Sequence, residues 1–125
     1  HVEDGLPRRD LRVTADHALL IDGVLVTAGA LVNGSTIRHL ALSDFGGSYT
    51  VYHIETEAHE IILAEGMPAE TYIDYVGRQA FENHAEYVAL YGADRPIAEM
   101  PQPRITMARH LPQALRARLG MERAA

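Results

Sequence analysis

The chain has 125 residues, 47% of them hydrophobic and 22% charged, which is the composition of one globular domain with a sizeable core. It contains no cysteine, so disulfides, thiolate metal sites and a cysteine nucleophile supplied by these residues are excluded. No apolar run approaches the roughly 20 residues that cross a bilayer, and we expect no membrane partner.

The net charge of −6 is distributed unevenly along the chain. Residues 1–100 carry 6 Arg and 16 acidic residues, whereas residues 101–125 carry 5 Arg and only one acid, Glu122. An acidic body repels nucleic acid, so we expect no nucleic-acid partner. The basic end, without interleaved aromatic residues, is typical of a solvated helix face or of a helix docked on an acidic surface.

The clearest structural pattern is a hairpin near the N-terminal end. Two apolar runs, Ala18–Ile21 and Val24–Thr27, flank Asp22 and Gly23, a residue pair that accepts the positive φ of a type I′ turn. A later run, Thr36–Leu40, follows another turn sequence and predicts a further short strand.

Two more strands are predicted in the middle of the chain. Tyr49–Glu57 and His59–Ala64 are rich in β-branched, aromatic and aliphatic residues. A loop with two glycines, Ser43–Ser48, precedes them, and Gly66 and Pro68 are expected to end the second strand.

The pattern becomes helical after residue 82. Asn83, with Glu86 three residues later, resembles a capping box and predicts a short helix that continues to Tyr91. Three prolines then predict an extended surface segment: Pro96, Pro101 and Pro103.

A second helix is predicted at the C-terminal end. Leucines recur there at positions i, i+4 and i+8, namely Leu111, Leu115 and Leu119, and Pro112 suits the first turn of a helix. The predicted organisation is a mainly β domain over residues 1–92 and a Pro-interrupted extension over residues 93–125 that ends in a basic amphipathic helix.

The first candidate for chemistry is the pair Thr14 and His17. The two residues stand between the run Leu11–Val13 and the hairpin, which places a hydroxyl and an imidazole on one turn. Such a pair suits proton transfer to or from one substrate atom. A Thr and a His in a turn also commonly satisfy backbone groups, so the pair by itself decides little.

The second candidate is a polar cluster within residues 51–60. If one strand runs through it, His53, Glu55, Glu57 and His59 share a face because side chains alternate. That set could bind zinc or a similar ion. The alternative is a polar, solvent-facing side of a strand, because residues two apart are about 7 Å apart and distant imidazoles cannot share one ion unless the chain bends.

Both clusters occur together and in order. Thr14-x-x-His17 is followed by Val51-Tyr52-x-Ile54-x-x-Glu57-x-His59 and then by Ala64-Glu65-Gly66. This combination resembles the B and F motifs of the Hint superfamily, the self-processing domains that inteins and hedgehog proteins share. The similarity is strongest to bacterial Hint-type domains, which also contain a stretch like His59–Glu70, and it covers about residues 6–92.

The resemblance implies a chemistry for each of the four candidate residues. In a Hint domain an N-terminal Cys or Ser attacks the peptide bond before it, and a thioester or ester replaces the amide. By resemblance, Thr14 would orient the scissile peptide and His17 would donate a proton to the leaving nitrogen. His59 matches the histidine of the F motif. His53 stands where many inteins have an Asp, and its imidazole could shuttle a proton.

Two features of the family have no counterpart in these residues. Residues 1–10 contain no Cys or Ser, and residues 66–71 contain no His-Asn pair of the kind that ends splicing domains. We therefore expect the nucleophile and the first strands in an upstream segment, joined covalently or present as a separate fragment. The chain alone is expected to be inactive, and unpaired sheet edges would favour complementation or self-association.

The sequence thus predicts a mainly β, Hint-like horseshoe of β-hairpins with a short helical C-terminal extension. The predicted function is autoproteolytic processing on the N-terminal side of the domain, without a cofactor or a metal. A metal-binding β module using His53 and His59 is one alternative, and a non-catalytic interaction domain with the same fold is another. Secretion follows only by analogy with similar bacterial proteins.

Overall fold

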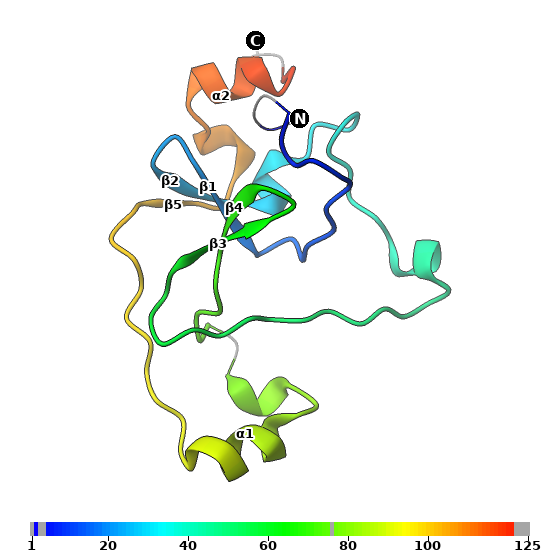
Figure 1. Ribbon diagram of the computed structural model, residues 1–125. Coiled ribbons are helices and arrows are strands. Elements are labelled where there is room, and N and C mark those ends of the chain that lie inside the picture. Colours follow the sequence, from blue (N-terminus) through cyan, green and yellow to red (C-terminus); the bar gives the residue numbers. More distant parts are fainter. Residues whose placement is uncertain (1, 3–4, 76, 122–125) are drawn as a thin grey trace.

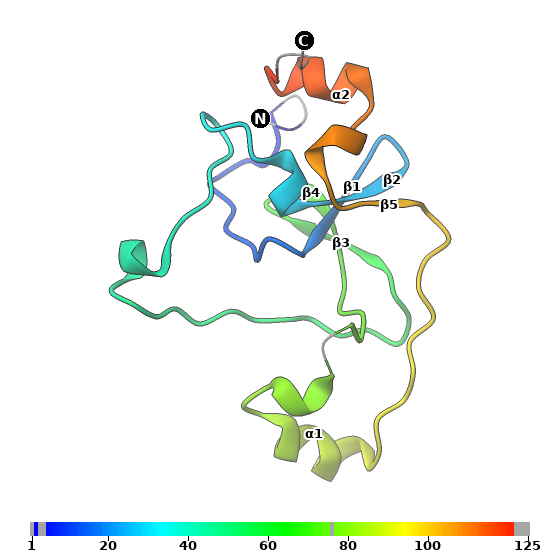
Figure 2. The same cartoon turned by 180° about the vertical axis from the view of Figure 1, so that it is seen from behind.

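A five-stranded sheet with the strand order β3-β4-β1-β2-β5 forms the centre of the protein. The computed structural model describes residue 2 and residues 5–75 and 77–121. Figures 1 and 2 show the sheet between two helices, α1 and α2, which lie at opposite ends of the molecule. The prediction of a mainly β fold with a short C-terminal helix is confirmed.

The predicted N-terminal hairpin is present with the predicted bounds. Strand β1 (Ala18–Ile21) pairs antiparallel with β2 (Val24–Thr27), and Ile21 lies opposite Val24. The two turn residues have positive φ, 52° at Asp22 and 80° at Gly23, as the type I′ turn requires. The local sequence is therefore sufficient to explain this element.

A second hairpin of the same form follows later in the chain. Strand β3 (Ile61–Ala64) pairs with β4 (Met67–Glu70) across Glu65 and Gly66, whose φ values are 48° and 80°. The predicted strand His59–Ala64 is present as β3 and ends before Gly66 as expected, but Pro68 does not take part in ending it, because it lies inside the next strand, β4. Pro68 lies opposite Leu63, one step from the turn, and residues at that step do not exchange hydrogen bonds, so the hairpin needs no amide hydrogen there.

Gly66 is under a tighter constraint than Gly23, although both have a φ of +80°. A Cβ on Gly66 would lie 2.9 Å from Leu6 Cδ2 and 3.1 Å from Arg8 Nε, whereas a Cβ on Gly23 meets nothing within 4 Å. Alanine in left-handed backbone costs about 1–2 kcal/mol at either site. We expect Gly66→Ala to cost about 1 kcal/mol more than Gly23→Ala in urea unfolding, because it also overpacks. Equal losses would show that the segment at Leu6 moves aside freely.

Two predicted strands are absent from the described residues. Thr36–Leu40 follows its turn as irregular chain, and Tyr49–Glu57 is extended but unpaired along most of its length. A strand is stabilised by a neighbour, and the described residues give the second segment one backbone hydrogen bond, from Tyr72 N–H to the Ile54 carbonyl (2.8 Å). The predicted loop before it contains a short 3₁₀ helix, Leu42–Phe45.

Both predicted helices are present. Helix α1 (His84–Tyr91) begins after Asn83, but the side chain of Asn83 makes no capping hydrogen bond, so the expected capping box does not form. Helix α2 (Gln113–Arg118) begins after Pro112. Among the described residues, no helix is long and apolar enough to cross a membrane.

Two strands were not predicted from the sequence, β4 of the second hairpin and a short strand further along the chain. Strand β5 (Arg104–Ile105) lies parallel to β2, with Leu25 opposite Arg104 and Val26 opposite Ile105. The Leu25 N–H also donates to the Pro103 carbonyl at 2.8 Å. These contacts attach the chain beyond α1 to the edge of the sheet.

The core lies between the sheet and the C-terminal helix. Its buried hydrophobic residues are Val2, Leu19, Ile21, Val26, Ala30, Leu31, Met67, Ala69, Leu111, Leu115 and Leu119. The three leucines of the predicted helical pattern are therefore all buried in this core. No residue of α1 is buried, so the two helices contribute very differently to the stability of the fold.

Candidate active site

A small cleft of about 40 Å³ lies beside the start of β1 and the end of β4. It is lined by Thr14, Asp16, His17, His53, Glu70, Thr71, Tyr72, Ile73 and Tyr75. Three of the four predicted site residues, Thr14, His17 and His53, thus share one cleft. Its volume accommodates about one or two water molecules or one small polar group.

A tight turn holds Thr14 and His17 together. The His17 N–H donates to the Thr14 carbonyl at 3.1 Å, which closes the turn. The Gly29 N–H donates to the Ala15 carbonyl at 2.8 Å, and the Ala28 N–H donates to the His17 carbonyl at 2.9 Å. Both side chains are half-buried, and the turn that carries them is anchored on the chain that follows β2.

His53 reaches the cleft from the extended segment after residue 48. The centroid of its ring lies 6.3 Å from that of His17, and it contacts Phe81 edge-on at 5.0 Å and Tyr72 edge-on at 6.3 Å. The hydrogen bond between the Tyr72 N–H and the Ile54 carbonyl fixes the adjacent backbone. His53 remains exposed, so its ring contacts solvent on one side and lies beside His17 on the other.

The environment of His17 makes its ring a stronger acid than a free histidine. Burial lowers the pKa of His17 below 6.5, and the nearby His53 lowers it further. The Glu70 charge and a hydrogen bond to the Glu70 backbone act in the opposite direction without overcoming burial. A protonated His17 therefore releases its proton readily.

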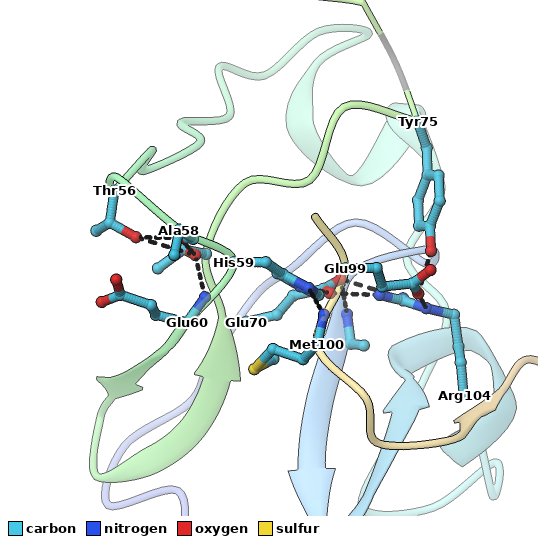
Figure 3. Close-up of polar contacts among 11 residues, drawn as sticks. Thr56, Ala58, His59, Glu60, Glu70, Tyr75, Glu99, Met100 and Arg104 are labelled. Carbon is cyan, nitrogen blue, oxygen red and sulfur yellow. Dashed lines mark hydrogen bonds and ion pairs between the residues drawn. The ribbon is translucent and has the colours of Figure 1, made fainter. Parts of the chain in front are cut away.

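His59 does not lie with the other three predicted residues. Its ring is buried. The Nε2–H of His59 donates to Glu70 Oε2 at 2.7 Å, and its Nδ1 accepts the Met100 N–H at 2.9 Å (Figure 3). Since the backbone amide donates to Nδ1, the ring hydrogen is on Nε2. Both nitrogens are thereby occupied, and His59 supports the structure around Glu70 instead of facing the cleft.

Glu70 is the centre of a buried polar network. Its carboxylate is 4% exposed and accepts the Ala18 N–H at 3.0 Å. Arg104 donates to both oxygens, from Nη1 at 3.2 Å and from Nη2 at 2.5 Å. Burial raises the pKa of Glu70, but hydrogen bonds from Arg104, Ala18 and His59 outweigh it and hold the pKa below its ordinary value.

The match to a family model decides the classification. A model of the Hint domain matches residues 1–76, which is more than half of the chain. The chain belongs to the Hint domain family. The searches of curated proteins and of solved structures found no match.

All four predicted site residues of this Hint domain lie within the matched range, and so does Glu70. Arg104 lies beyond it. The network that surrounds Glu70 therefore joins the matched part of the chain to residues after position 76.

The described polar residues of this Hint domain do not assemble a metal site. Within residue 2 and ranges 5–75 and 77–121, no group of three or more His, Asp or Glu residues could hold an ion. His53 and His59 are not on one strand face, since the first is exposed beside the cleft and the second is buried with both nitrogens occupied. The structure gives no support to a metal-binding module built on these two histidines.

A larger hollow of about 460 Å³ lies away from the Thr14 and His17 cleft. It is lined by Glu55, Thr56, Glu57, Tyr87, Tyr91 and Arg95. None of the four predicted site residues lines it. Two of its charged side chains already have partners, because Arg78 binds the Glu55 carboxylate at 2.8 Å and Arg95 donates to the Thr56 carbonyl at 3.1 Å.

Sequence reasoning missed Glu70 and Arg104. Glu70 ends the stretch His59–Glu70 that resembles bacterial Hint-type domains, but a single glutamate there carries no sign that it will be buried. Arg104 directly follows Pro103, in a part of the chain without a periodic pattern. A two-residue parallel strand gives no detectable pattern in a sequence, so nothing indicated that Arg104 would reach Glu70.

Proposed function

We propose that this chain is the C-terminal part of a self-processing Hint domain that promotes an N-to-S or N-to-O acyl shift at a Cys or Ser upstream of residue 1. The observation that carries the proposal is the cleft shared by Thr14, His17 and His53. A hydroxyl and two imidazoles around a small, half-buried space are suited to proton transfer at a single peptide group.

In the proposed reaction, the upstream Ser or Cys attacks the carbonyl carbon of the residue before it. A new C–O or C–S bond forms, the C–N bond of the peptide breaks, and the proton of the attacking hydroxyl or thiol passes to solvent. The nitrogen leaves as an amine and needs a proton, which His17 supplies. The Thr14 hydroxyl orients the scissile peptide by hydrogen bonding, and water or another nucleophile then releases the acyl group.

The lowered pKa of His17 suits this role. A ring that holds its proton weakly donates it readily to a nitrogen that becomes basic as the C–N bond breaks. His53, with its ring centroid 6.3 Å from that of His17 and exposed to solvent, is placed to return a proton through one intervening water.

The proposal requires a partner segment that supplies the nucleophile. The extended stretch 49–54 is suited to receive it, because Tyr49, Tyr52 and Ile54 are 51%, 87% and 58% exposed and most of the backbone there is unpaired in the described residues. Such a stretch is a template for strand addition. Completion by the upstream segment, or by a second copy when that segment is absent, would bury it.

The test is processing of a longer precursor that includes the upstream sequence, followed by intact mass spectrometry. We expect the wild-type precursor to yield a fragment that begins at a Cys or Ser. We expect His17→Ala to slow this reaction by about 10²–10⁴-fold, the usual contribution of a general acid, and Thr14→Ala to slow it less. His39→Ala, at an exposed histidine outside the cleft, is the matched control and should process normally.

Two outcomes would contradict the proposal. If the wild-type precursor stays intact at all times, including with added thiol, the acyl shift does not occur and a non-catalytic interaction domain becomes the better interpretation. If the wild type and His17→Ala process at the same rate, His17 does not supply the proton.

A further inference from the structure

We propose that Arg104, which lies outside the part of the chain matched by the Hint model, is a positioning residue for His17 and acts through the buried carboxylate of Glu70. The inference rests on the proposed function for its catalytic meaning. Its structural content, that Arg104 orders the start of β1, can be tested separately.

The first step links Glu70 to His17. The Glu70 carboxylate accepts the N–H of Ala18 at 3.0 Å, and Ala18 is the residue directly after His17. This contact lies where the chain passes from the Thr14–His17 turn into β1. The only registered pair between β1 and β4 in the described residues is Leu19 with Ala69, so the Glu70 side chain provides a second attachment of this end of β1.

The second step links Glu70 to Arg104. The guanidinium donates to both carboxylate oxygens, from Nη1 to Oε1 at 3.2 Å and from Nη2 to Oε2 at 2.5 Å. The bidentate geometry fixes the orientation of the carboxylate as well as its charge. Oε1, which accepts the Ala18 N–H, is one of the two oxygens that Arg104 holds.

The third step explains what holds Arg104. Its Nε donates to Glu99 Oε1 at 3.2 Å, and its guanidinium carbon lies 5.1 Å from the centre of the Tyr75 ring (Figure 3). The Tyr75 hydroxyl in turn donates to Glu99. Strand β5 places the Arg104 backbone beside Leu25 of β2. These contacts hold the guanidinium of Arg104 in place in addition to its hydrogen bonds to Glu70.

The fourth step concerns the consequence of losing Arg104. Glu70 accepts four hydrogen bonds in the described residues, and two of them come from Arg104. A carboxylate that is 4% exposed has little water to replace them. Without Arg104 the carboxylate must take up a proton or turn toward solvent, and either change weakens its hold on the Ala18 N–H.

The test is amide hydrogen exchange, measured by NMR on residues 1–125, in Arg104→Met and Arg104→Lys. We expect exchange at the Ala18 amide to accelerate by about tenfold or more in Arg104→Met, while Ile21 and Val24, which pair with each other at the hairpin turn, stay close to wild type. Lysine keeps the charge without the bidentate geometry, so Arg104→Lys should give a partial effect. Arg109→Met, at an exposed arginine of the same segment, is the matched control.

The His17 ring provides a second readout in the same samples. Glu70→Gln removes the charge that raises the pKa of His17, so that pKa should fall below its wild-type value. Arg104→Met should move the His17 ring resonances, and it should have little further effect on them when Glu70 is already Gln. Such non-additivity is expected only if Arg104 acts through Glu70.

Two results would overturn the inference. One is wild-type exchange at Ala18 and wild-type His17 resonances in Arg104→Met. The other is a uniform acceleration across all core amides, which would mean that Arg104 only stabilises the fold.

In the precursor, Arg104→Met should slow processing about tenfold relative to Arg109→Met. A wild-type precursor that never cleaves would refute the proposed function, while a selective change at Ala18 would still establish the positioning role.

Discussion

Replacing Glu70 by Gln is expected to lower the free energy of unfolding by about 3–5 kcal/mol at pH 7. The substitution keeps the shape of the side chain but leaves Arg104, whose side chain is 14% exposed, without its bidentate acceptor. It also weakens the hydrogen bonds that the side chain of residue 70 accepts from His59 Nε2–H and from the Ala18 N–H. Urea unfolding at pH 7 measures the loss.

The same substitution should flatten the acid side of the stability profile. The pKa of Glu70 in the folded protein lies below its ordinary value of 4.5, so its carboxylate contributes stability above pH 4.5 and loses that contribution as the pH falls through the lowered pKa. The wild type should therefore lose more stability than Glu70→Gln over that range. Glu60→Gln, at an exposed glutamate, is the control and should behave like the wild type.

Equal unfolding free energies for Glu70→Gln and Glu60→Gln at pH 7 would contradict this prediction. That result would mean that the carboxylate of Glu70 is hydrated in solution, and the positioning role inferred for Arg104 would lose its physical basis.

Replacing Leu115 by Ala is expected to cost about 2–5 kcal/mol, the usual range for a large-to-small change in a core. Leu115 is 1% exposed and belongs to the same core as β1, β2 and β4. For a domain whose total stability is about 5–15 kcal/mol, such a loss removes a large fraction of the free energy of unfolding and lowers the midpoint of thermal unfolding. Thermal and urea unfolding measure it.

Leu90→Ala in α1 is the matched control for Leu115→Ala. Leu90 is 67% exposed, so its truncation should change the unfolding free energy by no more than about 0.5 kcal/mol. A small effect at Leu115, comparable to that at Leu90, would show that α2 is not part of the cooperative unit that the sheet forms.

Elements stabilised by contacts between near neighbours were predictable from the sequence. Asp22 and Gly23 adopt the positive φ of a tight turn between two apolar runs, and the hairpin has the predicted bounds. The leucine spacing at the C-terminal end predicts a helix because one face of a helix must be buried, and α2 forms there. Leu115 lies in α2, Leu111 before it and Leu119 directly after it, and all three are buried.

Strand predictions based on composition were less successful. Tyr49–Glu57 has the residues of a strand, yet it is unpaired along most of its length in the described part of the chain. The reason is that β-propensity reflects packing on a neighbouring strand, which the segment itself does not supply. At Pro68 the error was the opposite one, since a real strand, β4, was not predicted. The missing amide hydrogen of Pro68 does not matter, because its position exchanges no hydrogen bond in the hairpin.

The candidate site likewise has one part that the sequence predicted and one part that it did not. The adjacency of Thr14 and His17 follows from their spacing in one turn, and the motif order pointed to the Hint family, to which residues 1–76 are matched. The approach of His53 to His17 depends on a hydrogen bond between Tyr72 and Ile54 and on ring contacts from Phe81, none of which has a sequence pattern.

The sequence alone was enough for the first hairpin, the terminal helix and the family, because each depends on residues within one turn or on an ordered set of short motifs. The separation of His59 from His53, the burial of Glu70 and its pairing with Arg104 emerged only in the folded chain. These contacts join segments 11 to 41 residues apart in the sequence. Their geometry is set by packing and by the need to compensate a buried charge, and neither is encoded in the spacing of neighbouring residues.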